Sequence, residues 1–225
     1  MPGRPHPLLT DYTYHVFNKT IDQKRLFEDK DLCQMFLDII WHYRSTNSYL
    51  RFSNFKKLPE ELRKPYAKKI NDKRSFRISI LAYCIMPTHY HFLLRQNQNT
   101  GISRFVSQIQ NSFTRYFNRK HERSGPIFLQ TFKSKPIISE EQLKHISRYV
   151  HLNPYSGRII TLIEDVREYP WSSFSDYISL SKAKLSEPEN VLSFFKNNKE
   201  RYRKFVLDNS AHQKMLEYCK YAEKW

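Results

Sequence analysis

Alternating and periodic hydrophobic positions predict both strands and helices along the first part of this chain. Residues 12–21 (YTYHVFNKTI) are rich in aromatic and β-branched types, which predicts a first strand. Apolar residues then recur at helical spacing over about 32–47, after Asp29 or Asp31 as a capping residue, and this predicts a helix.

A second group of elements follows a change in composition. Residues 53–75 are dominated by Lys, Arg, Pro and polar types, which is typical of an exposed, solvated loop or insertion; a contact to a DNA backbone is the alternative. Strands are expected at 76–85 and 89–95, and the short turn between them makes them a hairpin or neighbours in a sheet. A long helix is expected over about 102–121, since one face of it is strongly apolar.

The clearest boundaries surround a short helix in the second half of the chain. A turn and a further strand are expected within 125–138. Ser139 and Gln142 form a capping-box pattern for a helix over 140–152, and Pro154 is expected to end it.

The order of these elements decides the fold class. Strands and helices are interspersed without sequence repeats or regular βα alternation, so we expect an α+β fold with an antiparallel sheet flanked by helices. One domain is expected over 1–180, with the basic segment 53–75 as an insertion. A basic extension follows over 181–225, where the segment 194–205 (FFKNNKERYRKF) is expected to be helical and packed against the main domain.

Composition indicates the kind of partner. The chain has 225 residues, with 38 Lys and Arg against 22 Asp and Glu, a formal charge of +16, which favours a polyanion such as nucleic acid. No apolar run approaches a membrane span and no signal-peptide pattern is present, so we expect a soluble intracellular protein that is not associated with a membrane. No GxGxxG or GxxxxGK[ST] motif occurs, so no nucleotide cofactor is expected. The three cysteines are far apart and are expected to be buried thiols.

Two histidines in the expected strand 89–95 are candidate metal ligands. His89 and His91 are two residues apart, so their imidazoles project from the same face while Tyr90 points to the other. Two imidazoles on one face can share a metal ion, although such a pair can equally be structural, and a third ligand is needed.

The capped helix contributes a candidate nucleophile. Tyr149 and Asn153 are four residues apart and so lie on one side of that helix, at the edge of its apolar stripe. Tyr149 is expected to face a cleft, or simply to reach water at the helix edge. Tyr116 is a competing tyrosine, but it falls on the apolar stripe of its own helix, which favours a packing role.

Several strings of residues resemble, in their order along the chain, those of the REP-associated tyrosine transposases. These are relatives of the IS200/IS605-type transposases in the HUH superfamily of single-tyrosine enzymes. The strings span about 14–173 and are YHVFNKTI (14–21), CIMPTHYHFLLR (84–95), FTRYFN (113–118), GPIFLQTFKSKPI (125–137), RYVHLNP (148–154) and YPWSS (169–173). One departure is Thr88, where the family commonly has Asn; Thr can still supply a turn hydroxyl.

The resemblance implies a function for the candidate residues. It makes His89 and His91 ligands of a divalent metal, Mg²⁺ or Mn²⁺, with Asn153 as third ligand, and Tyr149 the catalytic tyrosine. It also implies a ferredoxin-like or RRM-like fold. The expected activity is that of a transposase that nicks and joins single-stranded DNA through a 5′-phosphotyrosine. The sequence names no general base with certainty; His145, one turn before Tyr149, is a candidate.

The resemblance further suggests a hairpin-forming palindromic repeat as the DNA partner and a monomer acting in cis, with a dimer as the alternative. It also implies a location in the prokaryotic cytoplasm, associated with the nucleoid. The residues expected to contact DNA are Arg115, Arg119, Lys120, Arg123, Gln130, Lys133 and Lys135. A protein that has lost catalysis and only binds or regulates repeat DNA, and a replication initiator or relaxase with the same chemistry, are the competing hypotheses.

Overall fold

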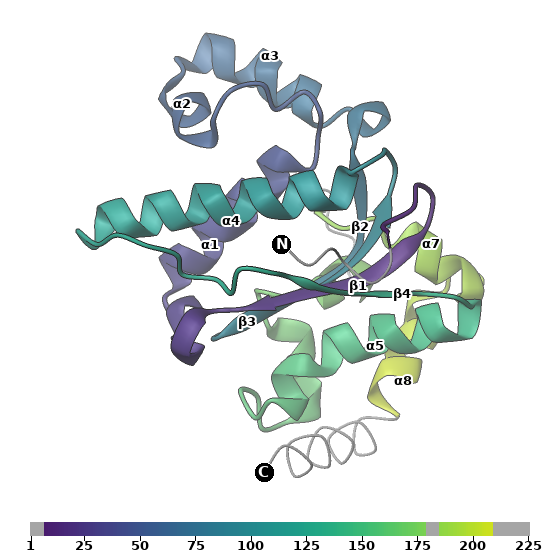
Figure 1. Cartoon of the computed structure of the whole chain (residues 1–225). Coiled ribbons are helices and arrows are strands. Elements are labelled where there is room, and N and C mark those ends of the chain that lie inside the picture. Colours follow the sequence, from purple (N-terminus) through teal and green to yellow (C-terminus); the bar gives the residue numbers. More distant parts are fainter. Residues whose placement is uncertain (1–6, 179–184, 209–225) are drawn as a thin grey trace.

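Four antiparallel strands form the central sheet of the computed structural model, which describes residues 7–178 and 185–208 (Figure 1). They are β1 (Thr13–Lys19), β2 (Ile78–Met86), β3 (His89–Gln96) and β4 (Lys133–Pro136), in the order β2-β3-β1-β4. Every neighbouring pair is antiparallel, and β2 and β3 form the expected hairpin. The predicted α+β class is confirmed.

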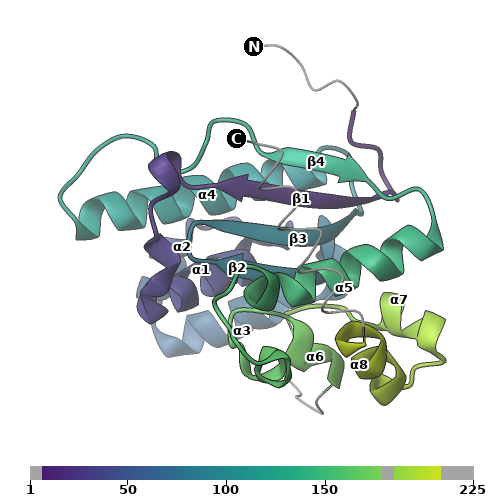
Figure 2. The ribbon, with the colours of Figure 1, turned by 90° about the horizontal axis from the view of Figure 1, so that it is seen from below.

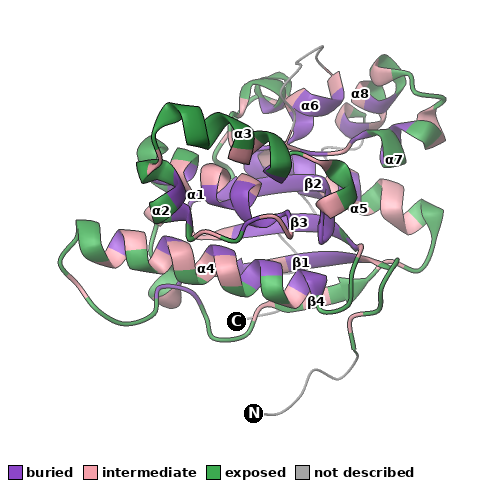
Figure 3. Ribbon diagram, turned by 90° about the horizontal axis from the view of Figure 1, so that it is seen from above, coloured by how far each residue is buried: buried purple, intermediate pink, exposed green. Residues whose placement is uncertain are grey.

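Two long helices cover one face of the sheet. They are α1 (Lys30–Tyr43) and α4 (Gly101–Lys120), which pack against each other and on the sheet (Figure 3). The Asp29 side chain caps α1 by accepting from the backbone N–H groups of Asp31 and Leu32. The chain order β1-α1-β2-β3-α4-β4 is the ferredoxin-like arrangement that was expected.

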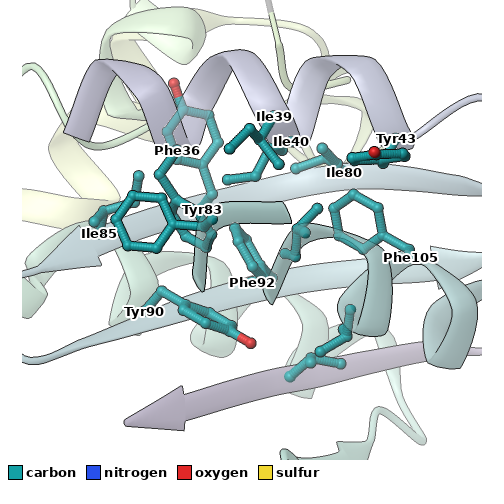
Figure 4. Close-up of a cluster of buried hydrophobic side chains, with 14 of the residues drawn as sticks. Phe36, Ile39, Ile40, Tyr43, Ile80, Tyr83, Ile85, Tyr90, Phe92 and Phe105 are labelled. Atoms are coloured by element: carbon teal, nitrogen blue, oxygen red, sulfur yellow. The ribbon is translucent and has the colours of Figure 1, made fainter. Parts of the chain in front are cut away.

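The core beneath α1 is aromatic. In Figure 4, Tyr43 of α1 lies beside Ile80 of β2, and the ring centroids of Phe36 and Tyr90 are 5.6 Å apart. The Tyr90 hydroxyl accepts a hydrogen bond from Gln110 of α4 at 2.7 Å, so this buried phenol is satisfied. Tyr90 therefore faces α1 and α4, as the two-residue period of the strand predicts.

The opposite face of the sheet is covered by the second half of the chain (Figure 2). Its main helix is α5 (Glu140–Ser156), followed by α6 (Phe174–Ile178), α7 (Glu189–Leu192) and α8 (Lys199–Leu207). Short 3₁₀ helices occur at Ile21–Gln23, Leu26–Glu28, Lys73–Ser75, Ile163–Glu168 and Ser193–Phe195. The predicted helix at 194–205 is confirmed for its second half by α8; the expected extension beyond residue 208 lies outside the described residues.

The segment 53–75 differs from the exposed loop that its composition predicts. It contains two helices, α2 (Phe52–Lys57) and α3 (Glu60–Ile70), and Phe52, Phe55 and Ile70 are buried. Few apolar residues suffice because Phe52 and Phe55, three apart, share one helical side, while the many charged residues remain exposed (Figure 3). The loop expectation was therefore wrong.

Pro154 does not end α5, which continues to Ser156. A proline at this position leaves the Val150 carbonyl without its helical N–H partner. The Asn153 side chain compensates, since its Nδ2 donates to the carbonyl oxygens of Tyr149 at 2.9 Å and Val150 at 3.4 Å. The predicted start is confirmed, because Ser139 Oγ accepts from the Gln142 N–H.

The cysteines and the helix lengths bear on two further expectations. Cys33 and Cys84 are buried free thiols, as expected, and Cys219 lies outside the described residues. Within residues 7–178 and 185–208, no helix combines the length and the apolar character that crossing a membrane requires.

Candidate active site

The pairing of β1 with β3 brings polar side chains of both strands to one face of the sheet. His91 lies opposite Phe17, and His89 lies opposite Lys19. Directly paired residues share a face, so these four side chains project toward the side that α5 covers. The ring centroids of His89 and His91 are 5.0 Å apart, which confirms the predicted convergence of the two imidazoles.

Helix α5 brings Tyr149 to the same place. The centroid of its ring lies 5.5 Å from that of His91, with the rings nearly perpendicular. Tyr149 is half-buried and packs at the border of the second core, so it stands at the rim that the helical periodicity predicts. Tyrosine and histidine belong to the same chain.

Asn153 lies one helical turn beyond Tyr149 and is 4% exposed. With Nδ2 donating to the α5 backbone, Oδ1 is the atom of this side chain that could bind a metal. In the part of the chain that the structure describes, no group of three or more His, Cys, Asp or Glu side chains is arranged to hold a metal ion. A metal at the histidine pair would thus need a ligand of another type, and an amide oxygen is such a ligand.

His15 is a member of this site that was missed from the sequence. It lies on β1, is 6% exposed, and its Nε2 is 2.9 Å from Nδ1 of His91. Its ring centroid is also 5.6 Å from that of Tyr149. The signal that could have found it is the alternation in β1, where His15, Phe17 and Lys19 occupy one face.

The surroundings of His89 favour its neutral form. Burial, together with the charge of Lys19, lowers the pKa of His89 to about 4. Its Nδ1 lies 2.9 Å from the Thr88 hydroxyl oxygen. At neutral pH the imidazole is therefore uncharged, which is the form that can donate a lone pair to a metal.

The residues expected to bind DNA fall into two groups, and one of them is near the histidines. Lys133 and Lys135 of β4 pair with Phe17 and His15 of β1, so their exposed side chains project from the same face as the site. Gln130 is exposed in the segment that leads into β4. These residues extend the site toward the β4 edge of the sheet.

The second group lies at the end of α4, on the other face of the sheet. Arg115, Arg119 and Lys120 are exposed there, and Lys120 Nζ is 3.8 Å from Asp29. Arg123 has a structural role, since its guanidinium donates to Asn118 Oδ1 at 2.9 Å and to the Pro126 carbonyl oxygen. This group does not join the histidines, and its contact with DNA remains a prediction.

Two alternative residues are placed elsewhere. Tyr116 packs against the aromatic core beneath α4, on the face opposite the histidine pair, which agrees with a packing role. His145, the candidate base, has its Nε2 2.7 Å from Glu141 and packs its ring on Phe205 of α8. The contacts of His145 are thus with its own helix and with α8.

A match to a family model identifies the protein family of this chain. The model described as "Transposase IS200 like" matches residues 9–153, which include every site residue named above from His15 to Asn153. The chain belongs to the IS200-like transposases. The match covers more than half of the chain and ends at the candidate third ligand.

One solved structure shows that this IS200-like transposase shares its fold with another protein. The structure of a REP-associated tyrosine transposase bound to a REP hairpin aligns with a TM-score of 0.53 and 13% identity, over 85% of this chain and 93% of that one. A candidate transposase from Deinococcus radiodurans R1 aligns with a TM-score of 0.34 and 16% identity, over 67% and 95% of the two chains. No curated protein sequence matches the chain significantly.

Proposed function

We propose that this IS200-like transposase is a metal-dependent endonuclease and strand transferase, which nicks and joins single-stranded DNA through a covalent bond to Tyr149. The observation that supports this most directly is the placement of the Tyr149 ring 5.5 Å from His91 within one chain. A tyrosine nucleophile and a candidate metal-binding pair thus meet without a second subunit, and we propose a monomer that acts in cis.

The residues fit a divalent cation. His89, His91 and the amide oxygen of Asn153 would hold Mg²⁺ or Mn²⁺; the low pKa of His89 keeps that imidazole available, and three ligands leave positions for phosphate oxygens. When bound, the ion supplies Lewis-acid polarisation of the scissile phosphodiester. The nucleophilic attack itself is assigned to the side chain of Tyr149.

The chemistry of Tyr149 follows from its position. Its phenol oxygen would attack phosphorus and give up its proton to water, forming a 5′-phosphotyrosine and releasing a 3′-hydroxyl. A second 3′-hydroxyl would attack the same phosphorus, freeing Tyr149 and joining the strands. The phosphotyrosine bond conserves the phosphodiester energy, so we expect no nucleotide cofactor.

The charge distribution supports a DNA substrate. The formal charge of +16 and the exposed Lys133 and Lys135 beside the site favour binding to a phosphate backbone. The solved relative is bound to a REP hairpin, and we propose that this chain likewise acts on hairpin-forming palindromic repeats, in the prokaryotic cytoplasm.

The test uses labelled hairpin oligonucleotides with single-stranded flanks and Mg²⁺ or Mn²⁺. Tyr149→Phe removes only the hydroxyl, so we expect loss of cleavage and of the covalent adduct with binding largely unchanged. Tyr116→Phe is the matched control, because Tyr116 lies on the opposite face and should retain full activity.

Other results would redirect the proposal. An adduct that persists in Tyr149→Phe would place the nucleophile elsewhere. Hairpin binding without any covalent product, with either metal and in the unmodified protein, would favour the alternative of a regulatory protein that binds repeat DNA.

A further inference from the structure

Both candidate metal ligands are engaged through the same ring atom. Nδ1 of His89 lies 2.9 Å from the Thr88 hydroxyl oxygen, and Nδ1 of His91 lies 2.9 Å from Nε2 of His15. Nε2 is therefore the atom that each imidazole would present to a metal. Outer hydrogen bonds of this kind fix the orientation and tautomer of metal-binding histidines.

The partner of His91 is unusual because it is another imidazole. The two rings meet edge to edge, with centroids 5.1 Å apart and planes 18° from parallel, and both residues are 6% exposed. A hydrogen bond between two buried neutral imidazoles needs one protonated and one unprotonated nitrogen. If His91 offers the Nε2 lone pair to a metal, its proton resides on Nδ1, and His15 Nε2 must be the acceptor.

The geometry also argues that His15 is not itself a ligand of the metal. Nε2 of His15 contacts Nδ1 of His91. The proposed metal-binding atom of His91 is the other ring nitrogen, Nε2. Accordingly, the three histidines do not form a metal-holding group among the residues that the structure describes. His15 thus contacts the ligand and not the position of the ion.

We propose that His15 is a positioning residue that holds His91 in its Nδ1–H tautomer and aims Nε2 at the metal. The proposal rests on the proposed metal-dependent function and goes beyond it, because it assigns a task to a residue that neither binds the metal nor attacks DNA. The contact with Tyr149, at 5.6 Å between ring centroids, places the same side chain against the nucleophile.

Thr88 performs the corresponding task for His89. The Thr88 carbonyl oxygen accepts from both the backbone N–H and the hydroxyl of Thr20, which is itself buried. These bonds hold the turn between β2 and β3 against β1. The hydroxyl at position 88 is thereby fixed where Nδ1–H of His89 can donate to it.

The experiment measures Mn²⁺ binding to the full chain without DNA, by titration calorimetry and by the electron paramagnetic resonance of unbound Mn²⁺. His15→Phe retains a ring at this position but removes the acceptor, and we expect Mn²⁺ affinity to fall about 10- to 100-fold. His15→Gln can replace the acceptor with its amide oxygen and should restore most of the affinity. Thr88→Val should resemble His15→Phe, and Thr88→Ser should resemble the unmodified protein.

Phe17→Leu is the matched control. Phe17 also contacts the His91 ring, with centroids 5.7 Å apart, but its side chain has no hydrogen-bonding atom. Its replacement should leave Mn²⁺ affinity nearly unchanged. Unaltered affinity in His15→Phe, or equal losses in His15→Gln and His15→Phe, would overturn the proposal.

A second measurement decides the matter even if His15→Phe does not fold. Long-range ¹H–¹⁵N correlation spectra of the metal-free, unmodified protein should show His91 as the Nδ1–H tautomer; an Nε2–H tautomer would overturn the proposal. This reading does not depend on metal. If the unmodified protein takes up no Mn²⁺ while His91 is in the Nδ1–H form, the metal in the proposed function fails and the assignment of His15 stands.

Discussion

Asn153 combines two tasks at the scale of a single residue. Its Nδ2 donates to the Val150 carbonyl oxygen, which loses its helical partner at Pro154, and its Oδ1 is the proposed third ligand. Pro154 therefore influences the orientation of the Asn153 amide at the site. Because Nδ2 is held by the helix backbone, the opposite end of the amide is directed away from that backbone.

Changes at Asn153 should separate these tasks. Asn153→Asp retains a ligand oxygen but turns a carboxylate toward the Tyr149 and Val150 carbonyls, so we expect Mn²⁺ binding to survive while stability falls by about 1–3 kcal/mol. Asn153→Ala should lose both. The measurements are urea unfolding and Mn²⁺ titration; an aspartate variant that is stable but no longer binds Mn²⁺ would contradict the assignment.

Individual residues differ in how far the sequence could predict them. His89, His91 and Tyr149 were accessible because each depends on the period of one element and on the family resemblance. For His15 the alternation in β1 indicates only the face of the strand, since its contact with His91 appears only when β1 pairs with β3, more than 70 positions later in the chain. Long-range strand pairing is the information that local patterns do not contain.

Single elements followed their local signals well where those signals were strong. The sheet strands, α1, α4 and the start of α5 agree with their apolar periods and caps. The charged segment 53–75 was misjudged because Phe55 within it and Phe52 just before it are buried despite the polar composition. Pro154 was misjudged because the Asn153 side chain donates to the carbonyl oxygen that the proline leaves without a partner. Tertiary contacts decided both cases.

The cap of α5 supports the helix that carries Tyr149. Ser139→Ala removes the Oγ that accepts from the Gln142 N–H, and should lower the free energy of unfolding by about 1 kcal/mol. Ser139→Thr, which retains an acceptor, should lose much less. Chemical denaturation measures both, and equal stabilities of the alanine variant and the unmodified protein would show that the cap contributes nothing.

The whole molecule consists of a sheet with a core on each face. The first is built from α1 and α4, and the second includes α5, α6 and α8. His151 links the parts of the second core, because its Nε2 lies 2.8 Å from Ser173 Oγ and its Nδ1 2.8 Å from the Tyr202 hydroxyl. Tyr202 belongs to the segment 194–205 of the C-terminal extension and is fully buried against α5. The expected packing of this segment against the main domain is therefore confirmed for Tyr202.

This buried histidine should make the fold sensitive to acid. Burial lowers the pKa of His151 to about 3, against about 6.5 when unfolded, so between these values the unfolded chain binds a proton that the folded one does not. The contribution of neutral His151 is complete above pH 6.5 and declines as the pH falls toward 3.

Unfolding free energy measured from pH 7 to 4.5 should decrease with acidification. His151→Asn should reduce that slope by up to about 1.4 kcal/mol per pH unit, whatever it does to stability at pH 7. His145→Asn is the control, because that histidine is exposed. An unchanged slope in His151→Asn would show that His151 does not titrate across this range.

The covalent intermediate tests the central claim most directly. The chain has 15 tyrosines, and mass spectrometry of peptides from the trapped protein–DNA complex can identify the one that carries a nucleotide. We expect the 5′-phosphate on Tyr149 alone, formed only when a divalent metal is present. A phosphorylated peptide that contains another tyrosine, such as Tyr116, or an adduct formed equally well in chelator, would contradict the site described above.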